Sequence, residues 1–183
     1  MQIAKQKLNE NIAEYILYMY QIEDVIRAYQ FDVDAIIERY VEPQMPDSSF
    51  INQYRSWYKD LVNQMKMQKI EKAGHLVSTQ EILLELSYLH NTLLNMTKDE
   101  KYVGVFEIAN KYLEEFKQRS NLKDKNSIEL AFHAMYMKLV LKLQGKEISA
   151  ETEEAFDAMR MMLAYLSKSY HRMKSGDLDF LNN

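Results

Sequence analysis

The stretch that decides the fold runs from Leu8 to Tyr29 and reads LNENIAEYILYMYQIEDVIRAY. Its apolar residues recur at alternating intervals of four and three, which is the spacing of one face of an α-helix. The residues of this stripe are Leu8, Ile12, Tyr15, Met19, Ile22, Ile26 and Tyr29. Leu17 and Val25 lie outside the stripe, so the middle of the helix is apolar on most faces. We therefore expect one continuous helix at the centre of a helical bundle.

Further amphipathic stretches follow this helix, and the residues at their ends indicate where each one begins or stops. Asp32 can cap a short helix, and the two prolines of the linker 41–47 exclude a helix directly after it. A long helix should then begin at Asp47 or Ser48 and end near Gly74.

Four more helices are predicted from their caps. Ser78 and Asn126 each stand three residues before a glutamate, which is the spacing of a capping box. Asp99 and Ser149 precede the other two apolar stripes, and Gly145 can end a helix in the left-handed conformation.

The connections between these helices span roughly 3 to 8 residues, so consecutive helices should pack antiparallel. We therefore predict an all-α fold, an up-and-down antiparallel helical bundle of about six long helices plus one short helix. No repeat is visible, and the linker 41–47 is too short to separate two independent units. Residues 1–183 should form a single all-helical domain.

Composition narrows the class of protein. The 183 residues are 47% hydrophobic and 27% charged, as in one folded domain, and the absence of cysteine excludes disulfides, thiolate metal sites and cysteine nucleophiles. A net charge of -4 argues against general nucleic-acid binding. The amino terminus shows no secretion signal, and the longest uncharged stretch, 86–97, is far shorter than the roughly 20 residues of a membrane span. We expect a cytoplasmic protein that does not bind membranes.

Helical bundles can hold carboxylate-bridged metal pairs, which need a glutamate three residues before a histidine on two helices. The residues three before His75, His90, His133 and His171 are Lys72, Ser87, Leu130 and Lys168. Glu129 and His133 are four apart and could pair, but one such pair is common as ordinary surface electrostatics. Glycine motifs that bind phosphate or dinucleotides are missing as well. We expect no metal, no cofactor and no catalytic residue.

If the first helix is central, its charged residues are buried and require partners. Arg27 can pair within the helix, with Glu23 at a spacing of four or with Asp24 at three. The alternative is a binding pocket between helices, because an unpaired buried charge is costly. The residues of that candidate pocket are Glu14, Tyr18, Asp24, Arg27 and His90. For His90 we favour a hydrogen-bonded core histidine over a catalytic one.

Several segments also resemble a known family. NIAEYILYM at 11–19, QIEDVIR at 21–27 and GHL at 74–76 resemble the domain-of-unknown-function family 4924 of Bacteroidetes, as does the segment 128–149. The resemblance covers nearly the whole chain, although tryptophan commonly stands in the family where this chain has Tyr20. It implies an all-helical cytoplasmic bacterial protein. It transfers no catalytic residue, because the family has no established activity.

Two functions remain open. The one that we favour is non-enzymatic: a helical protein-interaction or scaffold protein that binds an unknown partner, or itself as a homodimer, through a face rich in aromatic residues and methionine. The alternative is a small-molecule-binding protein or an enzyme, with the five candidate residues converging on a polar pocket between helices. A pocket lined by those residues would favour the second function, and a closed core with a large apolar surface patch would favour the first.

Overall fold

The computed structural model describes residues 2–45 and 47–177, and all regular elements within these ranges are helical. The all-α fold class that the periodicity predicts is thereby confirmed. The α-helices are α1 (Gln2–Glu10), α2 (Ile12–Ala28), α3 (Val33–Ile36), α4 (Ile51–Met67), α5 (Val77–Asn91), α6 (Glu100–Arg119), α7 (Ser127–Leu143) and α8 (Ala150–Lys174). The shorter elements are the π-turns η1 (Ile37–Val41) and η4 (Thr92–Met96) and the 3-10 turns η2 (Glu42–Gln44) and η3 (Ser48–Phe50).

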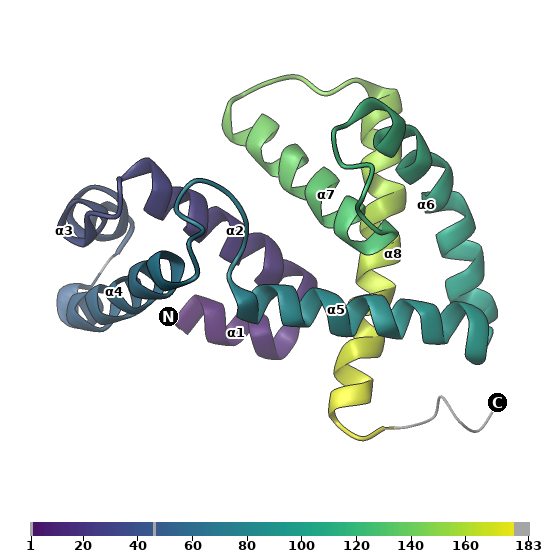
Figure 1. The fold of residues 1–183 in the computed structure, drawn as a ribbon, viewed down its shortest axis with the longest axis horizontal. Helices are drawn as coiled ribbons and strands as arrows, with labels where there is room; N and C mark the ends of the chain where they lie inside the picture. Colours follow the sequence, from purple (N-terminus) through teal and green to yellow (C-terminus); the bar gives the residue numbers. More distant parts are fainter. Residues whose placement is uncertain (1, 46, 178–183) are drawn as a thin grey trace.

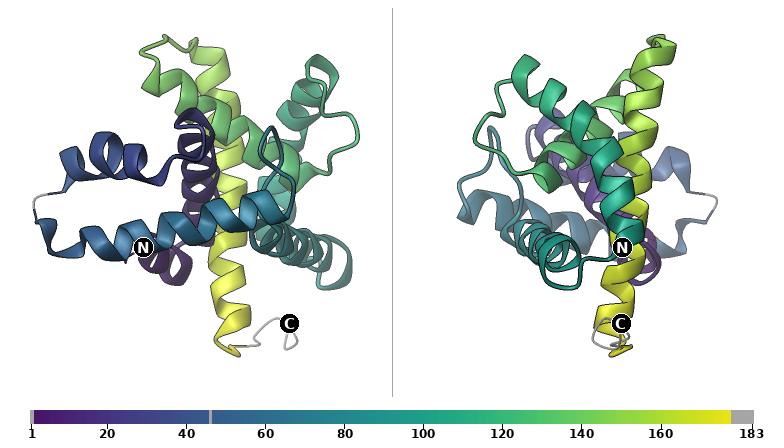
Figure 2. Two further views of the ribbon diagram at one scale, coloured as in Figure 1. Left: turned by 60° about the vertical axis from the view of Figure 1, so that its left-hand side comes forward. Right: turned by 90° about the vertical axis from the view of Figure 1, so that its right-hand side faces the viewer.

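Helix α2 lies between two apolar cores, which explains why its sequence is apolar on most faces. Ile12, Ile16 and Tyr20 belong to a larger core formed with α5, α6, α7 and α8. Ile22 and Ile26 belong to a smaller core formed with α3, η1 and α4. In Figure 1, α3 and α4 lie on one side of α2 and α6, α7 and α8 on the other. In the left view of Figure 2, α4 runs across in front of α8. The predicted central position of this helix is confirmed.

The predicted continuity of the first helix is wrong. Helix α1 ends at Glu10 and α2 begins at Ile12, with Asn11 extended between them at φ -154° and ψ 97°. The Oδ1 atom of Asn11 accepts hydrogen bonds from the backbone N–H groups of Ala13 and Glu14. An asparagine side chain readily accepts hydrogen bonds from the free N–H groups at the start of a helix. Asn11 therefore begins a new helix here instead of continuing the first one.

Most of the predicted helix starts are confirmed, because the capping side chain forms the expected hydrogen bonds. Asn126 and Glu129 form a complete capping box at the start of α7, and Ser149 caps α8. Asp32 and Asp99 cap α3 and α6. The long helix α4 is shorter than predicted, because it ends at Met67 rather than near Gly74. The chain from residue 68 to residue 76 is therefore a connection, and it contributes to the site described below.

Helices α6, α7 and α8 pack against one another, and α5 runs across α8 and contacts both α7 and α8 (Figure 1). This crossing places the first turns of α5 opposite the first turns of α7, next to the boundary between the two cores. Among the described residues, no helix is both long enough and apolar enough to cross a membrane.

Candidate functional site

The connection between α4 and α5 is held against α2 by Arg27. The Nη2 atom of Arg27 donates hydrogen bonds to the carbonyl oxygens of Gly74, at 2.5 Å, and Ile70, at 3.2 Å. Its Nη1 atom forms an ion pair with Asp24 at 2.9 Å. The second carboxylate oxygen of Asp24 accepts a hydrogen bond of 2.6 Å from Tyr136 on α7. This chain of contacts fixes the connection and α7 to the same end of α2.

Glu23, one turn before Arg27, holds the end of the same connection from the inside. Its side chain has no solvent exposure, and its Oε1 atom accepts a hydrogen bond of 3.0 Å from the backbone N–H of Leu76. The next backbone N–H, that of Val77, donates to the side chain of Gln68. Two side chains from outside the helix thus satisfy the N–H groups at the start of α5.

The predicted capping box at Ser78 is therefore wrong. Helix α5 begins at Val77, and its cap residue Leu76 has no side-chain hydrogen bond to the helix. A capping box is a local arrangement, whereas the start of α5 is set by Glu23, which lies 53 residues before Leu76. Of the two pairings that the spacing allows for Arg27, the one with Asp24 forms. The one with Glu23 does not, because the Glu23 carboxylate is directed at Leu76 and His75.

The other carboxylate oxygen of Glu23, Oε2, lies 2.7 Å from Nδ1 of His75. An ionised carboxylate only accepts hydrogen bonds, so this contact places a ring hydrogen on Nδ1, and in the neutral form of the ring Nε2 then carries the lone pair. The ring of Tyr20 stacks on His75 with 3.6 Å between the ring centroids and 15° between the planes. Position, orientation and hydrogen placement of the His75 ring are thus all determined by residues of α2.

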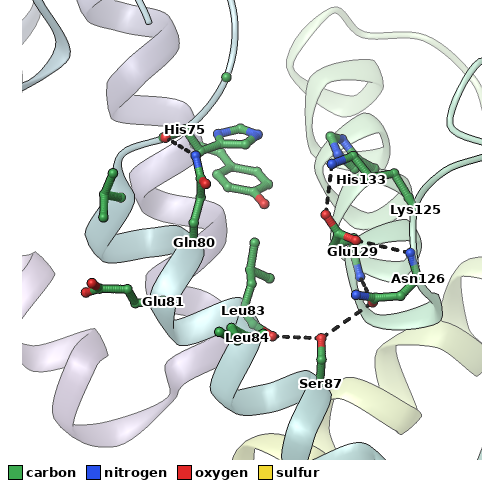
Figure 3. A pocket seen from close by; sticks show the side chains of 13 residues that line it. His75, Gln80, Glu81, Leu83, Leu84, Ser87, Lys125, Asn126, Glu129 and His133 are labelled. Carbon is green, nitrogen blue, oxygen red and sulfur yellow. Dashed lines mark hydrogen bonds and ion pairs between the residues drawn. The ribbon is translucent and has the colours of Figure 1, made fainter. Parts of the chain in front are cut away.

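His75 lines a pocket between α5 and the start of α7, with a cavity volume of about 520 Å³. Figure 3 shows His75 and Gln80 on one side of this pocket and His133 and Glu129 on the other. The ring centroids of His75 and His133 are 6.0 Å apart. Within the described part of the chain, neither Nε2 of His75 nor either ring nitrogen of His133 has a hydrogen-bond partner. We call this cavity, with Tyr20, His75, Glu129 and His133 in its walls, the polar pocket.

The charged groups on the α7 side of the polar pocket neutralise one another. Lys125 and Glu129 form an ion pair at 2.8 Å, and the backbone N–H of Asn126 also donates to Glu129. Burial favours the neutral form of Glu129, but these hydrogen bonds outweigh burial and lower the pKa of its carboxyl group. Burial, with smaller contributions from the nearby His75 and Lys125, lowers the pKa of His133. His133 is therefore neutral at pH 7, with one ring nitrogen able to accept a hydrogen bond.

The structure does not bring the five residues of the predicted pocket into one cavity. Glu14 is exposed and pairs with Lys7, and the ring of Tyr18 stacks on Trp57 beside the smaller core. Asp24 and Arg27 are paired with each other, as described above.

His90 lies away from those four residues, in the larger core region. It is buried, and its Nδ1 atom lies 2.7 Å from the hydroxyl of Tyr102. Burial lowers the pKa of His90 to about 4. This is the hydrogen-bonded core histidine that we favoured from the sequence.

Sequence reasoning missed the residues that do line the polar pocket, above all His75 and His133. One signal was available, since Glu23 is an acid on a helix that is apolar on most faces, and such a residue requires a partner. The identity of the partner could not be read from the sequence, because His75 lies in a connection 52 residues later. Within residues 2–45 and 47–177, no group of three or more histidine or acidic side chains is placed to hold a metal ion.

Comparison with known proteins gives the family and nothing about activity. No curated protein matches the chain, and no solved structure does. The sequence model of one family, described as a domain of unknown function (DUF4924), matches residues 1–177. Two of the segments that carry this resemblance, 21–27 and 74–76, are joined by the hydrogen bonds of Arg27 and Glu23 beside the polar pocket. The chain belongs to the DUF4924 family.

Proposed function

We propose that this protein is a cytoplasmic small-molecule-binding protein whose ligand occupies the polar pocket. The observation that carries the proposal is the contact between Glu23 and His75. A carboxylate without solvent exposure fixes an imidazole in the wall of a cavity, and an unpartnered nitrogen remains on that ring. Concave sites with a few oriented polar groups are the usual form of small-molecule sites.

The cost of burying Glu23 supports a role beyond holding the fold together. Burying a carboxylate costs several kcal/mol even when it is well paired, and apolar residues often replace buried ion pairs without loss of stability. The N–H of Leu76 needs only one acceptor, which an uncharged serine or asparagine could supply. The second oxygen of Glu23 orients His75. A ligand that binds to His75 in the polar pocket would require this orientation, which gives the buried carboxylate a role in binding.

The groups of the polar pocket favour a ligand that donates hydrogen bonds. One nitrogen of the neutral His133 ring is an acceptor, and so is Nε2 of His75 in the neutral form of that ring. Among the described residues, the lysine and acidic side chains that line the cavity are Glu81, Glu129 and Lys125, and Lys125 is already paired with Glu129. An anionic ligand would meet an excess of negative charge, so we propose an uncharged or cationic molecule with a hydroxyl or amino group.

Native mass spectrometry of freshly purified protein tests this proposal, because it detects a retained ligand directly. We expect a mass in excess of one chain that disappears in His133→Phe, which keeps the ring but removes both nitrogens. Glu14→Gln, which changes an exposed residue outside the pocket, should retain the extra mass. If no ligand is retained, binding of simple amines and alcohols is measured by calorimetry with the same variants. Equal binding by all three proteins would contradict the proposal.

A second candidate function is self-association, and a specific surface feature favours it. Val77, Leu84 and Tyr88 are spaced along one face of α5, and 48%, 73% and 68% of their surfaces are exposed. An apolar face of this kind fits an interaction protein that forms a homodimer. Sedimentation equilibrium should then give twice the chain mass, and Tyr88→Glu should shift the mass toward one chain. A mass of one chain at all concentrations would exclude this candidate.

A further inference from the structure

A second cavity, of about 570 Å³, lies between α6, α7 and α8. More of its lining residues carry aromatic or aliphatic side chains than in the polar pocket, although Glu115, Arg119 and Glu151 also line it. The apolar lining residues include Phe116, Leu122, Met137, Ala155, Phe156 and Met159. We call this second cavity the apolar cavity. Phe116 and Leu122 are only partly buried, so apolar surface in this cavity remains accessible to a ligand.

One face of α7 borders both cavities. Glu129, His133 and Met137 follow one another at intervals of four, so their side chains lie along the same side of the helix. Glu129 lines the polar pocket, Met137 lines the apolar cavity, and His133 lines both. The helical rise places Met137 about 12 Å beyond Glu129. Along this face of α7 the side chains change from a carboxylate at Glu129, through the neutral imidazole of His133, to the thioether of Met137.

We propose that the two cavities bind one amphiphilic molecule, with a hydroxyl or amino head in the polar pocket and an aliphatic chain in the apolar cavity. The inference rests on the proposed function and adds the chemical class of the ligand. Methionine at two positions of the apolar cavity suits a flexible chain, because its side chain adapts to irregular shapes. Among the lining residues, Arg119 is paired with Glu115 at 2.7 Å and Glu151 adds a further negative charge. These charges therefore give no advantage to an anionic ligand.

The experiment compares octan-1-amine with propan-1-amine, which carry the same head and differ in chain length. Calorimetry on the full-length protein should show that octan-1-amine binds about tenfold or more tightly, because additional methylene groups are buried. Octanoate, with the same chain and an anionic head, should bind more weakly than octan-1-amine. Ala155→Trp fills the apolar cavity and should reduce the affinity for octan-1-amine to that for propan-1-amine.

Two further variants keep the result interpretable. Ala164→Trp places the same side chain on an exposed position of α8 and should leave both affinities unchanged. Met137→Asp changes a residue that is 40% exposed, so it should preserve the fold, and it should weaken octan-1-amine alone. Thermal melts confirm that each variant is folded.

The outcomes separate the inference from the function on which it rests. If propan-1-amine binds and Ser87→Trp, in the polar pocket, abolishes its binding, the proposed function stands. If octan-1-amine then binds no more tightly, or Ala155→Trp and Met137→Asp affect both amines equally, the apolar cavity is not part of the site and the inference is overturned. If neither amine nor octanoate binds to the unmodified protein, both proposals fail.

Discussion

Oε2 of Glu23 lies 2.7 Å from Nδ1 of His75, while Oε1 of the same buried carboxylate accepts the backbone N–H of Leu76. One side chain of α2 thus both closes the start of α5 and orients the imidazole beside it. These two roles can be separated by substitution. The oxygen of an amide can still accept from the N–H of Leu76, whereas its NH₂ group donates to His75 instead of accepting from it.

The first prediction concerns Glu23→Gln. The amide oxygen can still accept from Leu76, but the amide N–H₂ must donate to Nδ1 of His75, so the ring hydrogen should move to Nε2. Long-range ¹H–¹⁵N spectra of the neutral imidazole report this change directly. We expect Glu23→Gln to cost about 1 kcal/mol of unfolding free energy, and Glu23→Ala about 3 kcal/mol because it leaves the Leu76 N–H unsatisfied.

Glu81→Gln is the matched control, since Glu81 is an exposed acid in the same pocket. It should leave both the tautomer of His75 and the stability unchanged. An unaltered His75 tautomer in Glu23→Gln would show that the carboxylate does not determine the hydrogen placement.

The second prediction concerns Arg27, whose side chain is 17% exposed and joins Asp24 to the carbonyls of Ile70 and Gly74. Arg27→Ala should lower the unfolding free energy by about 2 kcal/mol, because the connection loses its clamp while the half-exposed Asp24 can be rehydrated. Arg160→Ala is the control, since Arg160 pairs with Asp157 at the same spacing of three but both side chains are more than half exposed. It should cost no more than about 0.5 kcal/mol. If urea melts show that Arg27→Ala and Arg160→Ala lower the free energy of unfolding equally, the Arg27 contacts contribute no more than an exposed ion pair.

The third prediction concerns the glycine directly before His75. Gly74 has φ +97°, and a Cβ atom there would lie 3.3 Å from Cγ2 of Ile70. Gly74→Ala should therefore cost about 1 to 2 kcal/mol and displace the neighbouring imidazole. Gly104→Ala, within α6 and with no atom within 4 Å of the added Cβ, should instead stabilise the protein by about 0.5 to 1 kcal/mol. Stabilisation by both substitutions would show that residue 74 is free to leave the left-handed region.

The fourth prediction is a pH dependence of stability that arises from His90. Burial lowers the pKa of His90 from 6.5 to about 4 in the folded protein, so between these values the unfolded chain binds a proton that the folded protein does not. Stability should therefore decrease as the pH falls from 6.5 toward 4. Between about pH 7 and about pH 5, the proton uptake of His90 in the unfolded chain should lower the free energy of unfolding by about 2 kcal/mol.

Urea melts of the unmodified protein and of His90→Gln at these two pH values isolate this contribution. The comparison is needed because the lowered pKa of His133 acts in the same direction. The two proteins should differ in the pH dependence of their stability, and identical dependences would contradict the prediction. A ring titration of His90 near pH 6.5 in NMR spectra would contradict it as well.

The sequence by itself determined the helical class, the central position of α2 and most helix starts. Asn126, Asp99 and Ser149 could be identified as caps because a cap bonds to N–H groups two or three residues away, so the interaction is contained in the local sequence. The apolar character of α2 likewise reports its surroundings without showing which helices provide them. Asn11 is the exception: it caps α2, although the apolar stripe that continues on both sides of it predicts an unbroken helix.

Only the tertiary structure decided the start of α5, the partner of Glu23 and the composition of the polar pocket. The local spacing of Ser78 and Glu81 favoured a capping box, but Glu23 reaches the start of α5 from another helix. The same spacing argument paired Glu23 with Arg27, whereas burial directs the Glu23 carboxylate to the nearest available donors, Leu76 and His75. Periodicity describes which face of a helix is buried, but the donor that satisfies a buried carboxylate depends on how distant segments pack, and no local pattern contains that information.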